Sequence, residues 1–462
     1  MNTSDLFHLS NPCHVHFIGI GGISMSGIAE LLLSRGFTVS GSDNTESPLT
    51  MKLASLGAQV MIGQRAENIT ASIDLVVYTA AIHADNPEYA AVIAAGIPMM
   101  TRAEILGQIM KGYDTPIAIS GTHGKTTTTS MLSEMLLASD TDPTLSIGGI
   151  LKDIGGNFRV GASPLFVTEA CEYTNSFLSF FPKISIILNI EEDHLDFFKD
   201  INDIRNSFHQ FARLLPADGL LVINGAIPEL SALTEDLSCK VLTFGTSKDC
   251  DYYPSDITFD ENAHCSFVLH RAGKEDLSVK LHVPGEHNVL NAIAAFVVTD
   301  ALGLPEAPCL KALAEFTGTE RRFEYKGQKN GFTIIDDYAH HPTEITASLR
   351  AAQKYPHKTL WCVFQPHTYT RTKSFLKDFA KALSLSDKII LADIYAARET
   401  DTLGISSVTL QKEIEALGKE CIYFPTFEEI ENYICQNCQE GDVLITMGAG
   451  NVVKIGESLL SK

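Results

Sequence analysis

Residues 116–128 read PIAISGTHGKTTT, and this stretch decides the fold. Its first five residues are mostly apolar, as in a buried strand, and a helix is expected from Thr127 onward. Between the two, Gly121 and Gly124 allow backbone N–H groups to turn toward an anion, and the helix N-terminus adds a favourable dipole. The stretch therefore predicts a phosphate-binding loop between a strand and a helix.

The loop carries the two side chains that nucleotide chemistry needs. Lys125 would reach the β- and γ-phosphates, and Thr126 would offer its hydroxyl to Mg²⁺. The standard pattern has a further glycine at position 119, where this chain has Ile119, so the loop is a shortened variant. The alternative, a Gly-rich turn with an incidental lysine, is disfavoured because a strand precedes the loop and a helix follows it.

The same order of short apolar run, polar or Gly-rich turn and helical segment recurs along the chain. β-branched strands that alternate with helices predict the α/β class, with mainly parallel, doubly wound sheets. Three such units are expected, over residues 1–112, 113–321 and 322–462. Residues 241–283 read as short strands with turns, and we expect them to form an antiparallel edge on the second sheet.

The composition excludes several classes of protein. The 462 residues carry a formal charge of −21, which argues against binding nucleic acid or an anionic membrane. No apolar run approaches the roughly 18 residues that span a bilayer, and residues 1–13 lack a signal-peptide pattern, so a cytoplasmic protein is expected. The ten cysteines form no disulfide framework, and Cys435 and Cys438 lack the second pair that a zinc site would need.

Acidic residues and a histidine follow the two strands expected after the phosphate loop. Glu169 and Glu172 come at the end of one strand, and His194 follows the next. Ligands bind at the carboxyl ends of parallel strands, so these side chains are expected to face the loop. Because Mg²⁺ prefers oxygen ligands, Glu169 is predicted to bind it, with His194 at a second metal position or orienting a water. Solvated loop charges are the alternative.

The two outer units carry further candidate sites. In the first, Gly19, Gly21 and Gly22, with Asp43 after the second strand, fit either a nucleotide-phosphate site or an ordinary turn, because Ser24 replaces the third glycine of the dinucleotide pattern. In the third, polar clusters follow three strands. They lie at 336–342, 365–371 and 393–399, and their convergence on one sheet edge predicts a binding face.

Taken together, these motifs resemble the Mur ligase family over essentially the whole chain. The motifs are 16–22 (HFIGIGG), 121–128 (GTHGKTTT), Glu169 with Glu172, 189–194 (NIEEDH), 287–291 (HNVLN), 321–324 (RRFE), 337–342 (DYAHHP), and 365–367 (QPH) with Arg371. The resemblance implies a Rossmann-like UDP-binding domain, a central P-loop ATPase-like domain, and a Rossmann-like C-terminal domain that binds an amino acid. It also implies that ATP activates a carboxylate as an acyl phosphate, which an amine then attacks.

Within the family, the motifs are most similar to the members that join L-alanine to UDP-N-acetylmuramate in peptidoglycan synthesis. Members that join a whole tripeptide to the same sugar nucleotide during recycling are the close alternative. Later ligases of the pathway carry a carbamylated lysine downstream of the motif histidine, whereas residues 208–211 read FHQF here. Cys171 and Glu172 also replace the residues usual after the first Glu, which leaves open whether Glu172 touches metal.

The resemblance implies a role for individual residues, with ATP and Mg²⁺ as cofactors. Catalytic roles fall to Lys125, His194, His340 and Arg371. ATP contacts fall to Gly121, Thr122, His123, Gly124, Lys125, Thr126, Thr127, Asn288, Asn291, Arg322 and Asp337. UDP-substrate contacts fall to Gly19, Gly21, Gly22, Asp43, Thr79, Arg102 and His123. Amino-acid contacts fall to Tyr338, His340, His367 and Arg371. Metal contacts fall to Thr126, Glu169 and His194.

Two readings from other classes compete with a ligase. A dinucleotide-dependent oxidoreductase would use the first unit, but the interrupted glycine pattern and the phosphate loop argue against it. A nucleotide sensor without turnover leaves the polar clusters of the third unit unexplained. The oligomeric state and the choice among alanine, serine and glycine are left open, because one methyl group discriminates by only about 1–3 kcal/mol.

Overall fold

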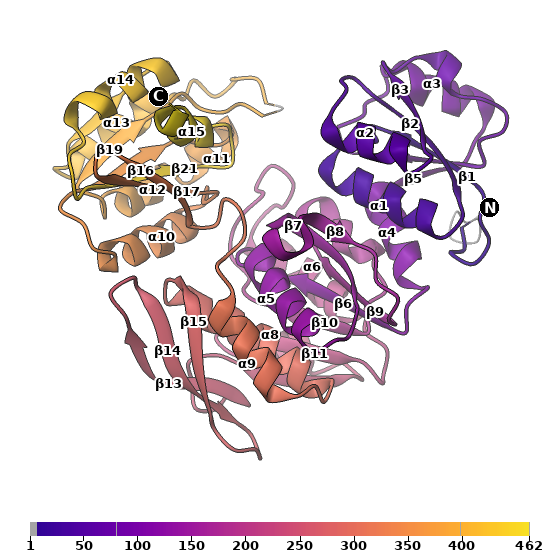
Figure 1. Cartoon of the computed structure of the whole chain (residues 1–462), viewed down its shortest axis with the longest axis horizontal. Helices are drawn as coiled ribbons and strands as arrows, with labels where there is room; N and C mark the ends of the chain where they lie inside the picture. Colours follow the sequence, from indigo (N-terminus) through magenta and orange to yellow (C-terminus); the bar gives the residue numbers. More distant parts are fainter. Residues whose placement is uncertain (1–6, 80, 398, 462) are drawn as a thin grey trace.

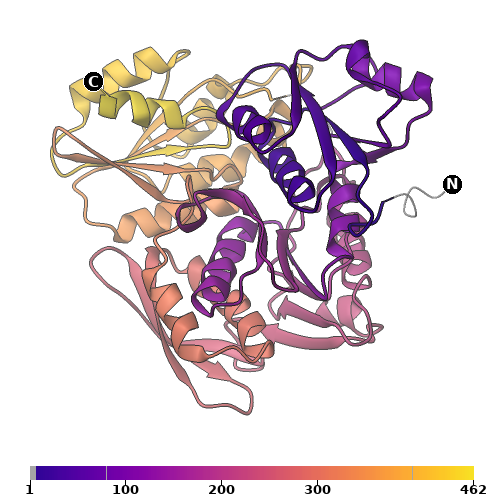
Figure 2. The same ribbon diagram turned by 45° about the vertical axis from the view of Figure 1, so that its right-hand side comes forward.

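The computed structural model describes residues 7–79, 81–397 and 399–461. It contains three separate sheets with helices packed against them, in the order expected for an α/β chain, so the predicted fold class is confirmed. Figure 1 shows the N-terminal part (indigo) and the C-terminal part (yellow) on either side of the central part, and Figure 2 gives a second view. The domain limits at 112 and 321 stay predictions. Arg398, part of the third polar cluster, lies outside the described residues.

The first sheet has five parallel strands in the order β3-β2-β1-β4-β5. Val15 and Phe17 of its central strand are fully buried in the core. The strands are β1 (His14–Ile18), β2 (Thr38–Asp43), β3 (Gln59–Ile62), β4 (Leu75–Tyr78) and β5 (Met99–Thr101). The helices are α1 (Ile23–Ser34), α2 (Pro48–Ser55), α3 (Pro87–Ala95) and α4 (Arg102–Met110), with the short 3₁₀ helix η2 (Ala66–Asn68).

The second sheet has ten strands in the order β15-β14-β13-β12-β11-β10-β6-β9-β7-β8. The strands are β6 (Thr115–Ser120), β7 (Thr144–Leu151), β8 (Gly156–Arg159), β9 (Leu165–Glu169), β10 (Ile184–Ile187), β11 (Leu220–Asn224), β12 (Lys240–Phe244), β13 (Tyr252–Phe259), β14 (His264–Arg271) and β15 (Leu277–Pro284). Its middle strands pair in parallel, whereas β13, β14 and β15 pair antiparallel, so the expected edge is confirmed from β13 onward, while β12 at the start of the predicted stretch pairs in parallel.

The predicted phosphate and metal residues lie at the carboxyl ends of β6, β9 and β10, and this sheet is covered by helices. They are α5 (Lys125–Ala138), α6 (Ile201–Ala212), α7 (Leu230–Thr234), α8 (His287–Ala301) and α9 (Glu306–Glu315), with the 3₁₀ helices η3 (Lys152–Ile154) and η4 (Tyr173–Ser179). The helix α8 is apolar nearly all round, with Ile293 and Val297 fully buried, because it packs between the sheet and α5.

The third sheet has six strands in the order β16-β17-β21-β18-β19-β20, all parallel except the β16–β17 pair. The strands are β16 (Glu324–Lys329), β17 (Phe332–Asp337), β18 (Leu360–Phe364), β19 (Lys388–Leu391), β20 (Cys421–Tyr423) and β21 (Val443–Met447). The helices are α10 (Pro342–Lys354), α11 (Tyr369–Ser374), α12 (Leu376–Leu383), α13 (Ser407–Ala416), α14 (Phe427–Asn437) and α15 (Val453–Ser461).

The N-terminal part packs tightly on the central part. The helix α4 lies against η4, and a Cβ added at Gly107 would stand 1.9 Å from the carbonyl oxygen of Ser179. A Cβ at Gly27 of α1 would likewise stand 2.4 Å from the ring of Phe158. These glycines are therefore required by close approach between the two parts, whose buried apolar residues form one continuous core. No helix among the described residues is long and apolar enough to cross a bilayer.

Candidate active site

The phosphate loop leaves β6 at Ser120 and enters α5 at Lys125, so the helix begins two residues earlier than the sequence predicts. The reason is Gly124, whose φ of 84° closes the loop directly before the helix. Gly121 also has a positive φ, of 142°. A Cβ at Gly124 would stand 2.6 Å from Oδ1 of Asn291, so only glycine lets the loop approach α8 this closely.

Lys125 is held inside its own loop by an acidic partner. Its Nζ donates to Oε2 of Glu172 at 2.9 Å and to the carbonyl of Thr122 at 3.2 Å. Burial opposes the charge on Lys125, but Glu172 outweighs it and raises the lysine pKa above its ordinary value. The carboxylate of Glu172 is itself buried, and its Oε1 accepts no hydrogen bond from the described residues.

The predicted metal residues lie in two neighbouring groups. Thr126 donates from Oγ1 to Oε2 of Glu169 at 3.1 Å, and Arg322 donates to the same hydroxyl at 3.3 Å. Burial raises the pKa of Glu169. His194 stands instead with Nε2 3.8 Å from Oε1 of Glu172, and its ring stacks on Tyr173. Glu172, whose contact with metal the sequence leaves open, therefore lies between Lys125 and His194.

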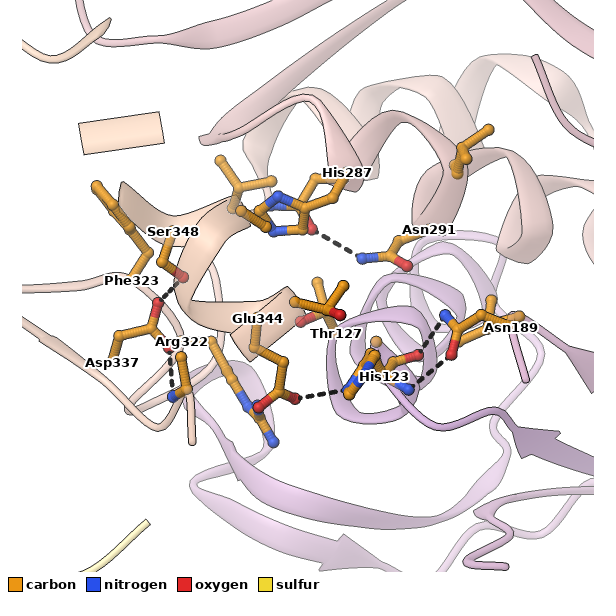
Figure 3. A pocket seen from close by; sticks show the side chains of 18 of the residues that line it. His123, Thr127, Asn189, His287, Asn291, Arg322, Phe323, Asp337, Glu344 and Ser348 are labelled. Carbon is orange, nitrogen blue, oxygen red and sulfur yellow. Dashed lines mark hydrogen bonds and ion pairs between the residues drawn. The ribbon is translucent and has the colours of Figure 1, made fainter. Parts of the chain in front are cut away.

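A pocket beside the phosphate loop collects most of the predicted ATP residues. Asn288, Asn291, Arg322 and Asp337 line it together with Thr127 and Gly124. Figure 3 shows Thr127, Asn291, Arg322 and Asp337 around this pocket, together with Glu344 and Ser348 of α10. Asn291 donates to Asn288 at 3.0 Å, which fixes both amides. Burial raises the pKa of Asp337 to about 6, and its Oδ2 accepts from Ser348.

His123 joins the central part to the C-terminal part. Its Nε2 lies 3.4 Å from Glu191 and its Nδ1 lies 3.3 Å from Glu344 of α10. His123, Glu191 and His341 place their ligand atoms within 4.8 Å of one another, yet both ring nitrogens of His341 already contact backbone groups, at Thr343 N and Glu192 O. We therefore interpret this cluster as a contact between domains, and not as a metal site.

Sequence reasoning missed Glu344. The only signal was a helix-capping pattern, in which His341 precedes Pro342 and Glu344 returns a hydrogen bond to the start of α10. That pattern indicates a helix start and says nothing of a partner more than 200 positions away in the phosphate loop. Burial opposes ionisation of Glu344, but the charge and the hydrogen bond of His123 hold its pKa well below the usual value.

The charge on His123 predicts a pH-dependent stability. Burial alone would lower its pKa, but the carboxylates of Glu191 and Glu344 raise it to about 9. The stability that the charged His123 contributes is therefore fully present below the pKa of about 6.5 that His123 has in the unfolded chain, and it is lost as the pH rises through about 9. The melting temperature of His123→Gln should lie below that of the wild type near pH 6, and the two should converge near pH 10. His209→Gln, at an imidazole that pairs with the exposed Asp236, is the control. A difference in melting temperature between His123→Gln and the wild type that does not change with pH would contradict the charged state assigned to His123.

The predicted amino-acid face forms at the carboxyl ends of β17 and β18. His340 and His367 have ring centroids 5.8 Å apart, and Nη1 of Arg371 lies 3.2 Å from Nδ1 of His367. Arg371 also donates from Nε and Nη2 to Oδ1 of Asp193, at 3.0 and 2.8 Å. Burial opposes ionisation of Asp193, but Arg371 holds its pKa well below the usual value. The guanidinium carbon of Arg322 lies over the ring of Tyr338, 5.1 Å from the centroid of that ring.

The predicted UDP-substrate residues lie in three places: an open pocket of the first sheet, the position of Arg102 beside α1, and the phosphate loop, which holds His123. Gly19, Gly22, Asp43 and Thr79 line one open pocket of the first sheet, and the amide of Gly21 donates to Asp43 at 2.9 Å. Arg102 does not line this pocket. Its guanidinium donates to Ser24 at 3.1 Å and interacts electrostatically with Glu169. Arg102 thus brings a cation of the N-terminal part within electrostatic range of Glu169.

Three family models match consecutive parts of the chain. The model described as "Mur ligase family, catalytic domain" matches residues 14–114, "Mur ligase middle domain" matches 119–299, and "Mur ligase, glutamate ligase domain" matches 321–450. Each match contains the strands of one of the three sheets, except that β6 begins before the start of the second match.

Relatives align over nearly the whole length. The UDP-N-acetylmuramate–L-alanine ligase of Agathobacter rectalis is 60% identical over 453 residues, which cover 98% of this chain and 99% of the relative. The enzyme of the same name from Clostridium botulinum (strain Hall) is 50% identical over 97% of each chain. The crystal structure of a UDP-N-acetylmuramate–alanine ligase from Thermotoga maritima has a TM-score of 0.81 at 31% identity and covers 97% of this chain and 98% of that one.

A murein peptide ligase from Psychrobacter arcticus shares the fold, with a TM-score of 0.71 at 24% identity and coverage of 97% and 98%. The family models account for all three sheets in order, and the relatives extend the likeness from one end of the chain to the other. The chain belongs to the Mur ligase family.

Proposed function

We propose that this protein is an ATP-dependent ligase that joins L-alanine to the lactyl carboxylate of UDP-N-acetylmuramate, a step of peptidoglycan synthesis. The observation that carries the proposal is the contact of Arg371 with Asp193, which brings a guanidinium of the third sheet beside His194, in the segment that follows β10, the strand paired with β6 of the phosphate loop. The names of relatives at 50–60% identity support the choice of substrates. Because ATP and UDP-sugars are cytoplasmic metabolites, the reaction would take place in the cytoplasm.

The phosphate loop would carry out the first step. A carboxylate is a poor electrophile, so its oxygen attacks the γ-phosphorus of ATP, ADP leaves, and an acyl phosphate forms. Lys125 lies at the helix N-terminus where the phosphates would bind, and it would exchange its contact with Glu172 for one with phosphate oxygens. Arg322, which reaches Thr126 from the segment before β16, would add a second cation.

The residues beside the loop fit Mg²⁺. The hydroxyl of Thr126 and the carboxylate of Glu169 are neighbouring oxygen ligands, and the buried Oε1 of Glu172 accepts no hydrogen bond from the described residues. Thr126 and Glu169 would hold the ion, with His194 and Glu172 beside it. When bound, Mg²⁺ would neutralise charge on the phosphoryl oxygens.

The C-terminal edge would present the amine. Burial lowers the pKa of His340 to about 3, so its imidazole is neutral. Its Nδ1 lies 3.0 Å from the carbonyl of Tyr338, which can only accept, so Nδ1 carries the proton and Nε2 keeps a lone pair. His340 could therefore accept a hydrogen bond from the alanine amine while Arg371 holds the carboxylate. The amine nitrogen attacks the acyl carbon, phosphate leaves, and the amine proton passes to solvent or phosphate.

Phosphate release tests the proposal directly. With ATP, Mg²⁺ and UDP-N-acetylmuramate present, release should rise on adding L-alanine and stay low when either the sugar nucleotide or the amino acid is omitted. Mass spectrometry of the product should show one alanine added. Release that is independent of the amino acid would refute the proposal, and a product that forms only with a tripeptide would reassign the protein to the recycling reaction.

A further inference from the structure

The third polar cluster of the sequence has no part in the function proposed above. It follows β19 and runs back alongside the segment after β18. His367 and Tyr395 form a parallel β-bridge, the amide of Thr368 donates to the carbonyl of Tyr395 at 2.9 Å, and the amide of Tyr395 donates to the carbonyl of Pro366 at 2.8 Å. The ring of His367 also stacks on that of Tyr395, with centroids 5.6 Å apart. The cluster is thus fastened to the amino-acid face.

Glu399 completes this attachment through its side chain. Its Oε2 accepts from the backbone amides of Tyr369 at 2.6 Å and Thr370 at 3.0 Å, and its Oε1 accepts from the hydroxyl of Thr370. The first amides of a helix have no partner within the helix, so the carboxylate supplies what the start of α11 lacks. Both oxygens are engaged, which argues for holding this backbone and against a role as a ligand to substrate.

The local cap of α11 is weak without Glu399. Thr368 is the N-cap residue, but its hydroxyl accepts from the amide of Arg371 at the long distance of 3.4 Å. Thr368 also has a φ of 66°, a left-handed conformation that costs free energy for a residue with a Cβ. The start of the helix therefore depends on a contact from a segment about 30 residues later in the chain.

Arg371 lies in the first turn of α11. Its side chain and that of Asp193 are only 9% and 8% exposed, so the guanidinium has one fixed orientation between the two parts of the protein. A cavity opens beside it, lined by Asp193, His194, His367, Thr370, Arg371 and Glu399. A shift of the first turn of α11 would move Arg371 relative to this cavity, with no change at the phosphate loop.

We infer that Glu399 is a positioning residue for the amino-acid substrate: its carboxylate fixes the first turn of α11 and thereby aims Arg371 at the substrate carboxylate. The inference rests on the proposed function, since it assigns Arg371 to the amino acid. A hydrogen bond to a charged group contributes enough that its loss changes affinity about 10- to 100-fold. Glu399→Ala should therefore raise the KM for L-alanine by that factor and change kcat less than about threefold.

The test is steady-state kinetics with each substrate varied in turn. In Glu399→Ala, the KM values for ATP and UDP-N-acetylmuramate should stay within about twofold of the wild type, because only the first turn of α11 changes. Trapping the acyl phosphate with borohydride in the absence of alanine should give the same yield in both proteins. Glu399→Gln, which keeps one acceptor oxygen, should lie between the wild type and Glu399→Ala.

Two further variants keep the test decisive. Thr370→Val removes the hydroxyl that donates to Oε1 of Glu399 but keeps the two backbone amides that donate to Oε2, so it should raise the KM for L-alanine less than Glu399→Ala does and add nothing to it. Glu420→Ala is the matched control, because Glu420 pairs with Lys388 on the exposed surface of the same sheet and should leave all constants unchanged.

The outcomes separate the two proposals. Wild-type protein without alanine-dependent phosphate release would overturn both. Alanine-dependent wild type with an unchanged alanine KM in Glu399→Ala and Thr370→Val would overturn only the role of Glu399. A fall in kcat with equal rises in all three KM values and a lower melting temperature would indicate a merely structural role and would also overturn it.

Discussion

Lys125→Ala should lower kcat by about 10³-fold or more, because Lys125 is the residue at the start of α5 that would neutralise the transferred phosphoryl group. Its ammonium is built into the loop and lies where the dipole of α5 also favours an anion. Alanine leaves the backbone amides of the loop in place, so nucleotide should still bind, with weaker affinity. Phosphate release at saturating substrates measures the loss, and nucleotide binding by calorimetry separates it from failure to bind.

The substitution also leaves a buried acid without its partner. Glu172 is 2% exposed and pairs with Lys125 in the wild type. In Lys125→Ala its buried carboxylate would have no cationic partner from this position, which destabilises the protein. Lys125→Ala combined with Glu172→Gln removes that unpaired charge and should recover part of the melting temperature without recovering turnover. If the double variant regained activity, the loss in Lys125→Ala would come from the stranded carboxylate, and the proposed role of Lys125 would be wrong.

Local sequence predicted the parts of the fold that depend on neighbouring residues. Gly121 and Gly124 marked the loop because only glycine adopts their positive φ angles without strain, and apolar runs marked the strands on either side. The helix start at Lys125 was placed two residues too late, because the sequence does not show that Gly124 already turns the chain into the helix. The short strands and turns of 241–283 indicated the antiparallel edge for a similar local reason.

The contacts between domains could not be predicted in the same way. Asp193 and Arg371 are 178 positions apart, and Glu191 reaches Thr343 across 152 positions. No spacing rule links such residues, because their meeting depends on how the third sheet docks on the second. In the sequence, Glu344 carries only a helix-capping signal, and Glu399 is one polar residue among several. The convergence of whole strand ends could be predicted, whereas the pairing of particular side chains could not.

The largest effect at that junction is expected for Arg371→Ala. Asp193 takes Nε and one hydrogen of Nη2, and His367 contacts Nη1, which leaves one hydrogen on each of Nη1 and Nη2 for the carboxylate of an amino acid. Removing the guanidinium takes away this fork and strands Asp193 inside the protein. Loss of the charged partner of the substrate carboxylate costs about 2–5 kcal/mol in binding, so kcat/KM for L-alanine should fall by about 10²- to 10³-fold while acyl phosphate still forms; the stranded Asp193 should separately lower the melting temperature.

Arg371→Lys and Asp193→Asn separate the two roles of the guanidinium. Lysine keeps the charge beside Asp193 but has no planar fork, so it should restore the melting temperature more fully than the alanine affinity. Asp193→Asn combined with Arg371→Ala should remove the unpaired charge of Asp193 and leave the alanine KM high. Because Glu399 acts through the same helix, Glu399→Ala added to Arg371→Ala should raise the alanine KM no further. An additive effect would mean that Glu399 contributes to binding by a route that does not pass through Arg371.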